Sequence, residues 1–229
     1  MSKPVNNIKR QALVGLAALA VVLWLALFLP VGSLNYWQAW TYWFVFLICV
    51  SAISIYFLKK DLNLIASRLK TGPSAEKEKS QKIANSLISI FFILLILIPP
   101  IDHRFQLSIV PLYLVLASDV FVALGLLIVF LVFKENSFTS AVIEVNEGQK
   151  VISTGPYGLV RHPMYAGALL ILLFTPLALG SFWGLFALIP MFLVITLRVV
   201  EEEKFLAKNL PGYAEYCKKV RYRLIPFIW

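Results

Sequence analysis

The stretch NSFTSAVIEVNEGQKVISTGPYGLVRHPMYAG, residues 136–167, determines how this chain is organised. It is the long segment between positions 83 and 200 that is not mostly apolar. Its second half places a turn dipeptide, two tyrosines, an arginine and a histidine within about a dozen residues. That density suggests a chemical site. An interfacial anchor is the alternative, because arginine, histidine and tyrosine at the end of a membrane helix commonly meet lipid headgroups.

The local structure of this stretch follows from its glycine and prolines. Gly155 and Pro156 mark a turn. The residue before a proline is disfavoured in the helical region, so His162 is expected to be extended or turn-like. Pro163 suits the first position of a helix, where its missing N–H costs nothing. The sequence therefore predicts a helix starting near Pro163, whose free N–H groups beside Arg161 could hold an anion or a polar cofactor.

The composition places the chain in the membrane. It has 229 residues, of which 60% are hydrophobic, and a mean hydropathy of +0.81, outside the range of soluble globular proteins. The formal net charge is +9, but the basic residues lie between apolar runs, as in cytoplasmic loops, so we expect no nucleic-acid partner. Cys49 and Cys217 show no metal or redox spacing and are expected to be free thiols.

Four apolar runs, at residues 11–30, 37–58, 83–101 and 109–133, are long enough to cross a hydrocarbon core of about 30 Å. Aromatic residues around the start of the second run are interpreted as an interfacial belt: Tyr36, Trp37, Trp40, Tyr42 and Trp43. His103 is expected to be a solvated loop residue between the third and fourth runs. Asp119, within the fourth, is expected to line a cavity or to bond a neighbouring helix.

Two shorter apolar runs follow, residues 166–179 and 182–197, separated by Gly180 and Ser181. Each is marginal for spanning alone, so they are interpreted as a hairpin that brings Arg161 and Glu202 to one membrane face. A final helix is expected from Arg198 to about Leu210. The predicted fold is therefore an all-α integral membrane protein with about four spanning helices, a membrane hairpin and a cytoplasmic C-terminal helix.

The charge distribution predicts the orientation. The segment 59–82 is the most basic in the chain, with Lys59, Lys60, Arg68, Lys70, Lys77, Lys79 and Lys82. By the positive-inside rule it is cytoplasmic. Counting the spans then places both termini and residues 136–167 on the cytoplasmic side. The chain is expected to divide into N-terminal membrane helices, 1–133, and a site-forming part, 134–229.

Two sets of residues carry a resemblance to a known family. TGPY at 154–157 and VRHPMYAG at 160–167 resemble the first half of the isoprenylcysteine carboxyl methyltransferase signature. The second half is similar to a set spread over the C-terminal part: Glu202, Glu203, Leu206, Tyr213, Tyr216, Arg223 and Pro226. The family also resembles the phospholipid N-methyltransferases, and both use S-adenosylmethionine. Residues 1–100 match only as generic membrane helices.

The resemblance implies roles for individual residues. It implies a cofactor site formed by Gln149, Lys150, Val151, Ile152, Tyr157, His162, Pro163, Met164, Tyr165, Glu202 and Glu203. Arg198 matches an arginine assigned to catalysis and the acceptor, and Arg161 is the motif arginine near the transfer site. Arg223, with Arg221 as the alternative, would contact the acceptor. Gln149 departs from the family pattern, because many members have histidine there.

Methyl transfer is compatible with the few reactive motifs in this sequence. Methyl transfer from a sulfonium is an in-line displacement that needs alignment and a dry site but no covalent enzyme intermediate. The chain accordingly has no nucleophile triad motif, no metal-ligand spacing and no dinucleotide-binding glycine motif. Arg198 and Glu202, four residues apart, would share one helix face, with Glu201 and Glu203 pointing elsewhere.

The expected partners are membrane lipids and a lipophilic or prenylated acceptor. The two motif-linked arginines favour a carboxylate acceptor, with a phospholipid amine as the alternative. The membrane hairpin and cytoplasmic site also resemble the NADPH-dependent membrane sterol reductases, which keeps a reductase open as a second class of enzyme.

Overall fold

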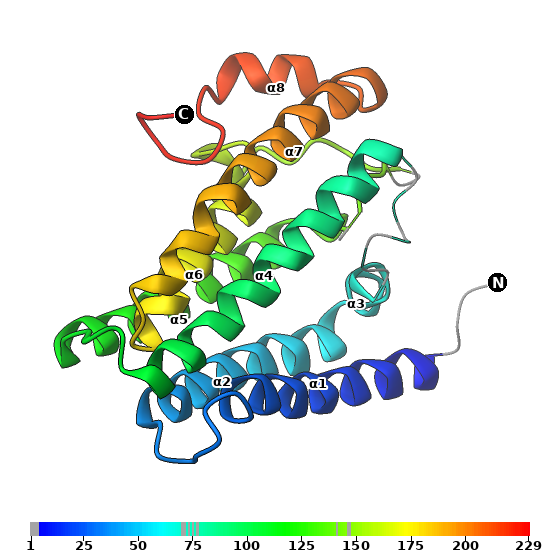
Figure 1. The fold of residues 1–229 in the computed structure, drawn as a ribbon. Helices are drawn as coiled ribbons and strands as arrows, with labels where there is room; N and C mark the ends of the chain where they lie inside the picture. Colours follow the sequence, from blue (N-terminus) through cyan, green and yellow to red (C-terminus); the bar gives the residue numbers. More distant parts are fainter. Residues whose placement is uncertain are drawn as a thin grey trace.

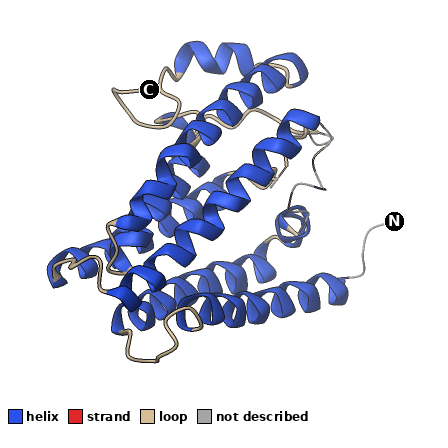
Figure 2. Ribbon diagram, in the orientation of Figure 1, coloured by secondary structure: helices blue, strands red, loops and turns tan. Residues whose placement is uncertain are grey.

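The apolar runs form long helices in the computed structural model. It describes residues 5–69, 72, 74, 76, 78–140, 142–145 and 148–229; Lys70 and Lys77 of the basic segment lie outside these ranges. Within the described residues the secondary structure is helical, with no strand (Figures 1 and 2). The elements are α1 (Val5–Phe28), α2 (Trp37–Lys60), α3 (Leu62–Arg68), α4 (Lys79–Phe105), α5 (Leu112–Glu135), η2 (Gly155–Gly158), α6 (Pro163–Ala178), η3 (Trp183–Ala187), α7 (Leu188–Asn209) and α8 (Tyr213–Lys219).

Five stretches are long and apolar enough to cross a membrane: α1, α2, α4, α5 and the continuous segment Trp183–Asn209. The predicted all-α membrane fold is therefore confirmed. One detail differs, because the second arm of the hairpin was expected to be only marginal for spanning alone, whereas Trp183–Asn209 is long enough. Through η3 and α7 it continues to Asn209, well beyond its apolar part, since the charged turn around Glu202 remains helical.

The turn between α4 and α5 also differs from the prediction. Residues 102–105 belong to the last turn of α4, which ends where Gln106 adopts a left-handed conformation (φ 52°). The prediction that His103 is a solvated loop residue is wrong. Its ring stacks on Tyr36 with centroids 4.0 Å apart, and its Nε2 lies 3.1 Å from the Asn35 carbonyl oxygen.

The aromatic residues at the start of α2 serve two purposes. Trp37 is 43% exposed, as a belt residue would be, but Tyr36 and Tyr42 are buried. The Tyr36 hydroxyl donates to the Leu179 carbonyl oxygen (2.5 Å), and the Tyr42 hydroxyl lies 3.1 Å from Thr175 Oγ1. The belt interpretation is therefore wrong for these two tyrosines, which tie α2 to α6 in the core.

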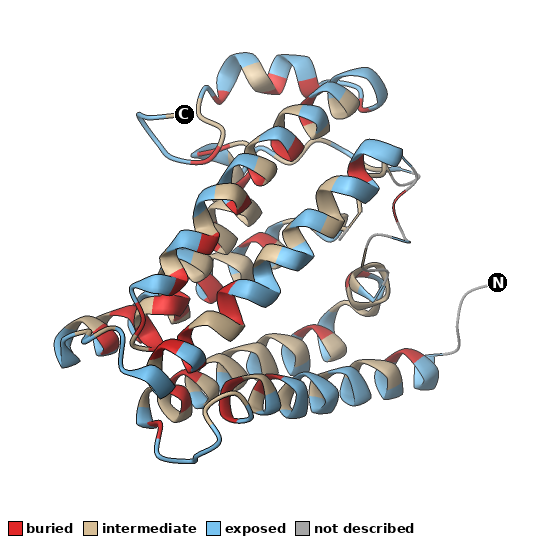
Figure 3. Ribbon diagram, in the orientation of Figure 1, coloured by how far each residue is buried: buried red, intermediate tan, exposed pale blue. Residues whose placement is uncertain are grey.

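The buried residues gather where the long helices converge (Figure 3). Asp119 is buried on α5, outside the cavity described below.

Two glycines bring α5 and α6 into close contact. A Cβ atom on Gly125 would lie 2.6 Å from Ile171 Cγ1 and 2.9 Å from the Gly167 carbonyl oxygen. On Gly167 it would lie 3.0 Å from the Gly125 carbonyl oxygen. Small residues of this kind let membrane helices approach backbone to backbone. The contact sets the position of α6, and hence of the residues at its N-terminus.

The predicted start of α6 at Pro163 is confirmed, with His162 in a non-helical conformation and Gly155–Gly158 forming a short 3₁₀ turn. The predicted break after α7 is also found, because Gly212 has φ 85° and α8 follows. The hairpin brings the start of α6 beside the end of α7, as predicted: Tyr165 donates to Glu202 at 2.8 Å. Figure 1 shows α8 and the C-terminal loop at that end of α7.

The orientation predicted from charge can be tested by cysteine labelling. In a Cys49→Ala, Cys217→Ala background, a cysteine at exposed Ser74 should resist a membrane-impermeant maleimide in intact cells and react after permeabilisation. A cysteine at Leu107, which is 60% exposed in the α4–α5 connection, should react in intact cells. Labelling of the Ser74 position alone in intact cells would contradict the orientation.

The packing of α5 on α6 gives a stability prediction. Gly125→Leu should lower the free energy of unfolding by about 1 to 3 kcal/mol, because the added side chain forces the helices apart. Thermal unfolding of the purified protein in detergent measures this. Gly15→Leu is the matched control, because a Cβ there meets nothing within 4 Å. Equal stability of the two variants would show that the close approach is not required.

Candidate functional site

A cavity of about 400 Å³ lies where the ends of several helices meet the loop between α5 and α6. Its volume is in the range of small-molecule sites. The wall combines both halves of the signature with α3, α4 and the loop. The lining includes Arg68, Asn85, Asn136, Ser140, Glu144, Gln149, Lys150, Val151, Ile152, Tyr157, Met164, Tyr165, Arg198, Glu202, Leu206, Tyr213 and Tyr216.

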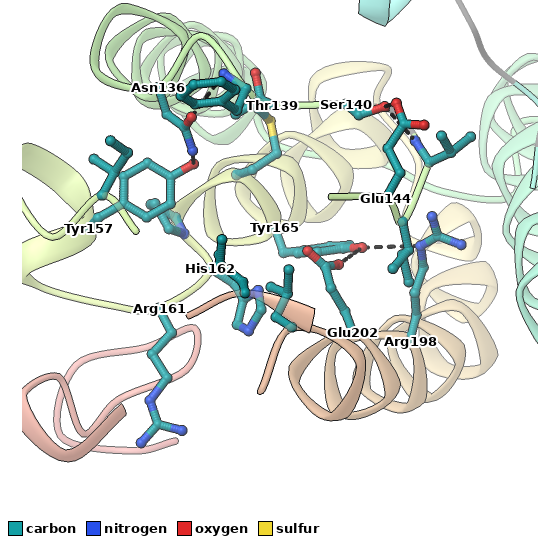
Figure 4. Close-up of a pocket in the computed structure, with 18 of the residues that line it drawn as sticks. Asn136, Thr139, Ser140, Glu144, Tyr157, Arg161, His162, Tyr165, Arg198 and Glu202 are labelled. Carbon is teal, nitrogen blue, oxygen red and sulfur yellow. Dashed lines mark hydrogen bonds between the residues drawn. The ribbon is translucent and has the colours of Figure 1, made fainter. Parts of the chain in front are cut away.

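Tyr165 joins the two charged residues of α7 that face the cavity. Its hydroxyl donates to Glu202 Oε2 at 2.8 Å and accepts from Arg198 Nε at 3.1 Å (Figure 4). The prediction that Arg198 and Glu202 share a helix face is confirmed. Since the phenol bridges them, it fixes the orientation of both side chains at once.

Arg198 forms a buried ion pair and is not a cation free to bind a ligand. Its Nη2 lies 2.5 Å from Glu76 Oε1, and its Nη1 donates to Gln81 Oε1 at 2.9 Å. The Arg198 and Glu76 side chains are 5% and 1% exposed. Glu76 comes from the basic segment 59–82, which the charge distribution predicts to be cytoplasmic. Its signal was weak: it is one of three acidic residues in that segment.

Glu203 has a different role from its neighbour Glu202. Its Oε1 lies 3.1 Å from Arg161 Nη1 and 3.3 Å from His162 Nε2, and its Oε2 lies 2.8 Å from Arg223 Nε. We call these four residues the Glu203 cluster. Arg161 and His162 line the cavity, whereas Glu203 and Arg223 do not, so the Glu203 carboxylate lies behind this part of the wall. Two residues on which the resemblance places ligands are therefore used to hold the protein together.

The same cluster anchors the C-terminal segment to the signature turn. Arg161 Nε donates to the Val220 carbonyl oxygen (2.7 Å) and its Nη2 to that of Cys217 (2.8 Å). The backbone N–H groups of Arg161 and His162 donate to the carbonyl oxygens of Tyr222 and Arg223, each at 2.9 Å. The Arg161 guanidinium consequently points away from Tyr157 and Tyr165 (Figure 4). Arg221 is exposed.

The opposite wall is formed by the loop. Four residues that the resemblance assigns to the cofactor line the cavity here: Gln149, Lys150, Val151 and Ile152. The Tyr157 hydroxyl accepts from Asn136 Nδ2 at 3.0 Å. Burial raises the pKa of Tyr157 to about 12, an effect that this hydrogen bond partly offsets. The phenol is therefore protonated at neutral pH and can donate to a ligand.

Several cavity residues were not predicted. Arg68 donates through Nη1 to the Ser140 carbonyl oxygen (2.7 Å), and the Ser140 hydroxyl donates to Glu144 Oε1 (3.2 Å). Asn136 and Asn85 add amide groups. Asn136, Ser140 and Glu144 lie within the polar segment 136–167, so the polarity of that segment was a usable signal. Arg68 and Asn85 lie outside it and depend on the tertiary fold.

The Glu203 cluster gives a prediction about the C-terminal segment. Glu203→Gln leaves the Arg161 and Arg223 guanidinium groups without a carboxylate, and breaking a buried pair costs about 3 to 5 kcal/mol. We expect a lower unfolding temperature and faster proteolysis after α8. Glu215→Gln, which loses only an exposed pair with Lys218, should behave like the wild type. Equal behaviour of the two variants would contradict the anchoring role.

Comparisons with known proteins match parts of this chain. A model of the phospholipid methyltransferase family matches residues 113–211, from α5 to the end of α7. The chain is also 34% identical over 89 residues to the Delta(14)-sterol reductase TM7SF2 of Mus musculus. That alignment covers 36% of this chain and 20% of the reductase, so the chain spans about a fifth of that relative. The family match supports a membrane methyltransferase.

Proposed function

We propose that this protein is an integral membrane enzyme that transfers a methyl group from S-adenosylmethionine to a lipid-borne acceptor. The observation that carries the proposal is the single cavity in which the residues of both signature halves meet. Tyr157, Met164 and Tyr165 from the first half face Glu202, Leu206 and Tyr213 from the second. The family match covers the same residues apart from Tyr213.

The cavity fits the cofactor. S-Adenosylmethionine has an adenosine, an amino-acid moiety and a sulfonium, and it supplies an electrophilic methyl group when bound. The Glu202 carboxylate can accept from its ammonium group, since one oxygen bonds only one phenol. Val151, Ile152 and Leu206 provide apolar surface for the adenine ring. Gln149 and Lys150 add polar groups on the same wall. His162 and Pro163 line the cavity at the start of α6, and Glu203 contacts His162 from behind.

The protein's contribution to the reaction is alignment and exclusion of water. The methyl carbon moves from sulfur to a lone pair of the acceptor as the carbon–sulfur bond breaks, which leaves a neutral thioether. No side chain has to form a covalent bond. Tyr165 holds Glu202 and Arg198 in place, and a position at the helix ends allows a lipid to approach from the bilayer. The bound methyl donor and acceptor would then lie in one preorganised site.

The ion pairs of the arginines weaken the argument for a carboxylate acceptor relative to a phospholipid amine. The preference for a carboxylate rested on Arg161 and Arg198, and both guanidinium groups are now seen to be paired with glutamates. A carboxylate would have to displace Glu76 from Arg198. An amine acceptor requires no such exchange, although its ammonium must first lose a proton. We therefore propose a phospholipid amine as the first acceptor to test, and an isoprenylcysteine-type carboxylate, with Arg198 or Arg223 as its contact, as the second.

The similarity to a sterol reductase motivates a second candidate, an NADPH-dependent reductase. The two proposals differ in the charge that the cavity must accept. NADPH brings several phosphate charges, whereas S-adenosylmethionine brings a sulfonium and an ammonium that suit Glu202 and Glu144. Isothermal titration calorimetry in detergent separates the two. We expect binding of S-adenosylhomocysteine. Binding of NADPH without a response to S-adenosylhomocysteine would favour the reductase.

A pair of neighbouring variants tests the cofactor site. Glu202→Gln should weaken S-adenosylhomocysteine binding about ten- to a hundredfold, because a charge-assisted hydrogen bond contributes about 1.5 to 3 kcal/mol. Glu201→Gln is the matched control: Glu201 is exposed on the same helix, and its contact with Gln81 can be kept by a glutamine oxygen. Calorimetry on both variants gives the comparison. Wild-type affinity in Glu202→Gln would exclude a direct contact.

A further inference from the structure

Arg68 is a cation in the cavity wall, and its partners among the described residues are all neutral. It is the last residue of α3, in the part of the chain that the family model does not cover. Its Nη1 donates to the Ser140 carbonyl oxygen at 2.7 Å and its Nη2 lies 3.7 Å from the Met164 sulfur. Its guanidinium carbon lies 4.8 Å from the centre of the Phe133 ring.

The other arginines of the site each pair with a glutamate carboxylate, which Arg68 lacks among the described residues. Arg161 and Arg223 meet Glu203, and Arg198 meets Glu76. Among the described residues, Arg68 has no carboxylate within ion-pair distance. Burial lowers the pKa of Arg68, which the phenols of Tyr165 and Tyr157 partly counteract. A partly buried cation that keeps its charge next to a carbonyl, a thioether and a ring is incompletely compensated.

The guanidinium also has donors to spare. It carries five N–H groups in a planar fork, and the described residues accept two hydrogen bonds from it, one of them through sulfur, a weak acceptor. The recorded contacts hold the group in place: a backbone carbonyl and an aromatic ring fix its plane. A fixed arginine fork with unused donors matches the geometry of a carboxylate or a phosphodiester, which it can bind with two parallel hydrogen bonds.

We propose that Arg68 binds an oxyanion of the ligand held in the cavity, and so supplies the anion contact that the paired arginines of the signature cannot. The proposal rests on the methyltransferase function and deepens it, by adding a recognition residue from outside the signature. The oxyanion has two sources within that function: the carboxylate of the cofactor's amino-acid moiety, or the phosphodiester of a phospholipid acceptor. In either case α3 becomes part of the binding site.

Two pairs of ligands distinguish the sources on the full-length protein in detergent. S-Adenosylhomocysteine is compared by calorimetry with 5′-methylthioadenosine, which keeps the nucleoside and the thioether but lacks the amino-acid moiety. Phosphatidylethanolamine is compared in methyl transfer with oleylamine, which keeps the amine but lacks the phosphate. The variants are Arg68→Gln, Arg68→Lys and the control Arg104→Gln, an exposed arginine in the last turn of α4.

If Arg68 holds the cofactor carboxylate, Arg68→Gln should weaken S-adenosylhomocysteine about ten- to a hundredfold and leave methylthioadenosine unchanged. If it holds the acceptor phosphate, the KM for phosphatidylethanolamine should rise about tenfold or more, while that for oleylamine and the cofactor affinity stay unchanged. Arg68→Lys should retain part of the effect. Equal losses for both members of each pair, or no loss in any, would overturn the proposal in favour of a purely structural arginine.

Thermal unfolding with pyrophosphate tests the Arg68 anion site independently of methyltransferase activity. Millimolar pyrophosphate should raise the unfolding temperature of the wild type and of Arg104→Gln, and should raise that of Arg68→Gln less, because the variant lacks the anion contact. The same rise in all three would overturn the oxyanion site. A wild type that ignores S-adenosylhomocysteine but shows the Arg68-dependent rise would contradict the methyltransferase function and leave the anion site standing.

Discussion

The site depends on one carboxylate, that of Glu203. It meets two guanidinium groups and a histidine ring that come from two segments far apart in sequence. A carboxylate this buried is stabilised only when its charge is compensated and its oxygens are hydrogen-bonded. The Glu203 cluster satisfies both conditions. In doing so it holds the signature turn, α7 and the C-terminal segment together, and the cavity wall follows from their positions.

This arrangement gives the adjacent glutamates separate roles. Glu203 balances Arg161 and Arg223, whereas Glu202 faces the cavity and is oriented by Tyr165. Glu76 balances Arg198 from the other side. After this pairing, the cavity wall retains Glu202 and Glu144 as anions and Arg68 and Lys150 as cations. Lys150 is exposed, whereas Arg68 is partly buried. A ligand carrying an ammonium and an oxyanion, such as an amino acid moiety or a phospholipid headgroup, complements Glu202 and Arg68.

Local features of the structure were predictable wherever the physical cause is local. The start of α6 follows from the backbone restriction of Pro163, and the turn before it from Gly155 and Pro156. Spacing of four residues was enough to place Arg198 and Glu202 on one face. The resemblance pointed to the loop residues from Gln149 to Ile152. What failed depended on distant contacts: His103 is ordered by stacking on Tyr36, and Tyr36 and Tyr42 are buried because α6 packs against them.

The pairing of charges could not be predicted for the same reason. Nothing near Arg198 in the sequence indicates that Glu76, more than a hundred positions away, neutralises it.

The central claim is that the cavity supports methyl transfer to a lipid, and incorporation of label tests it most directly. Protein in nanodiscs that contain phosphatidylethanolamine is incubated with S-adenosylmethionine labelled in the methyl group, and the lipids are extracted. We expect label in the phospholipid fraction with the wild type and much less with Glu202→Gln. Absence of label from every lipid and prenylated acceptor, in protein that binds the cofactor product, would contradict the claim.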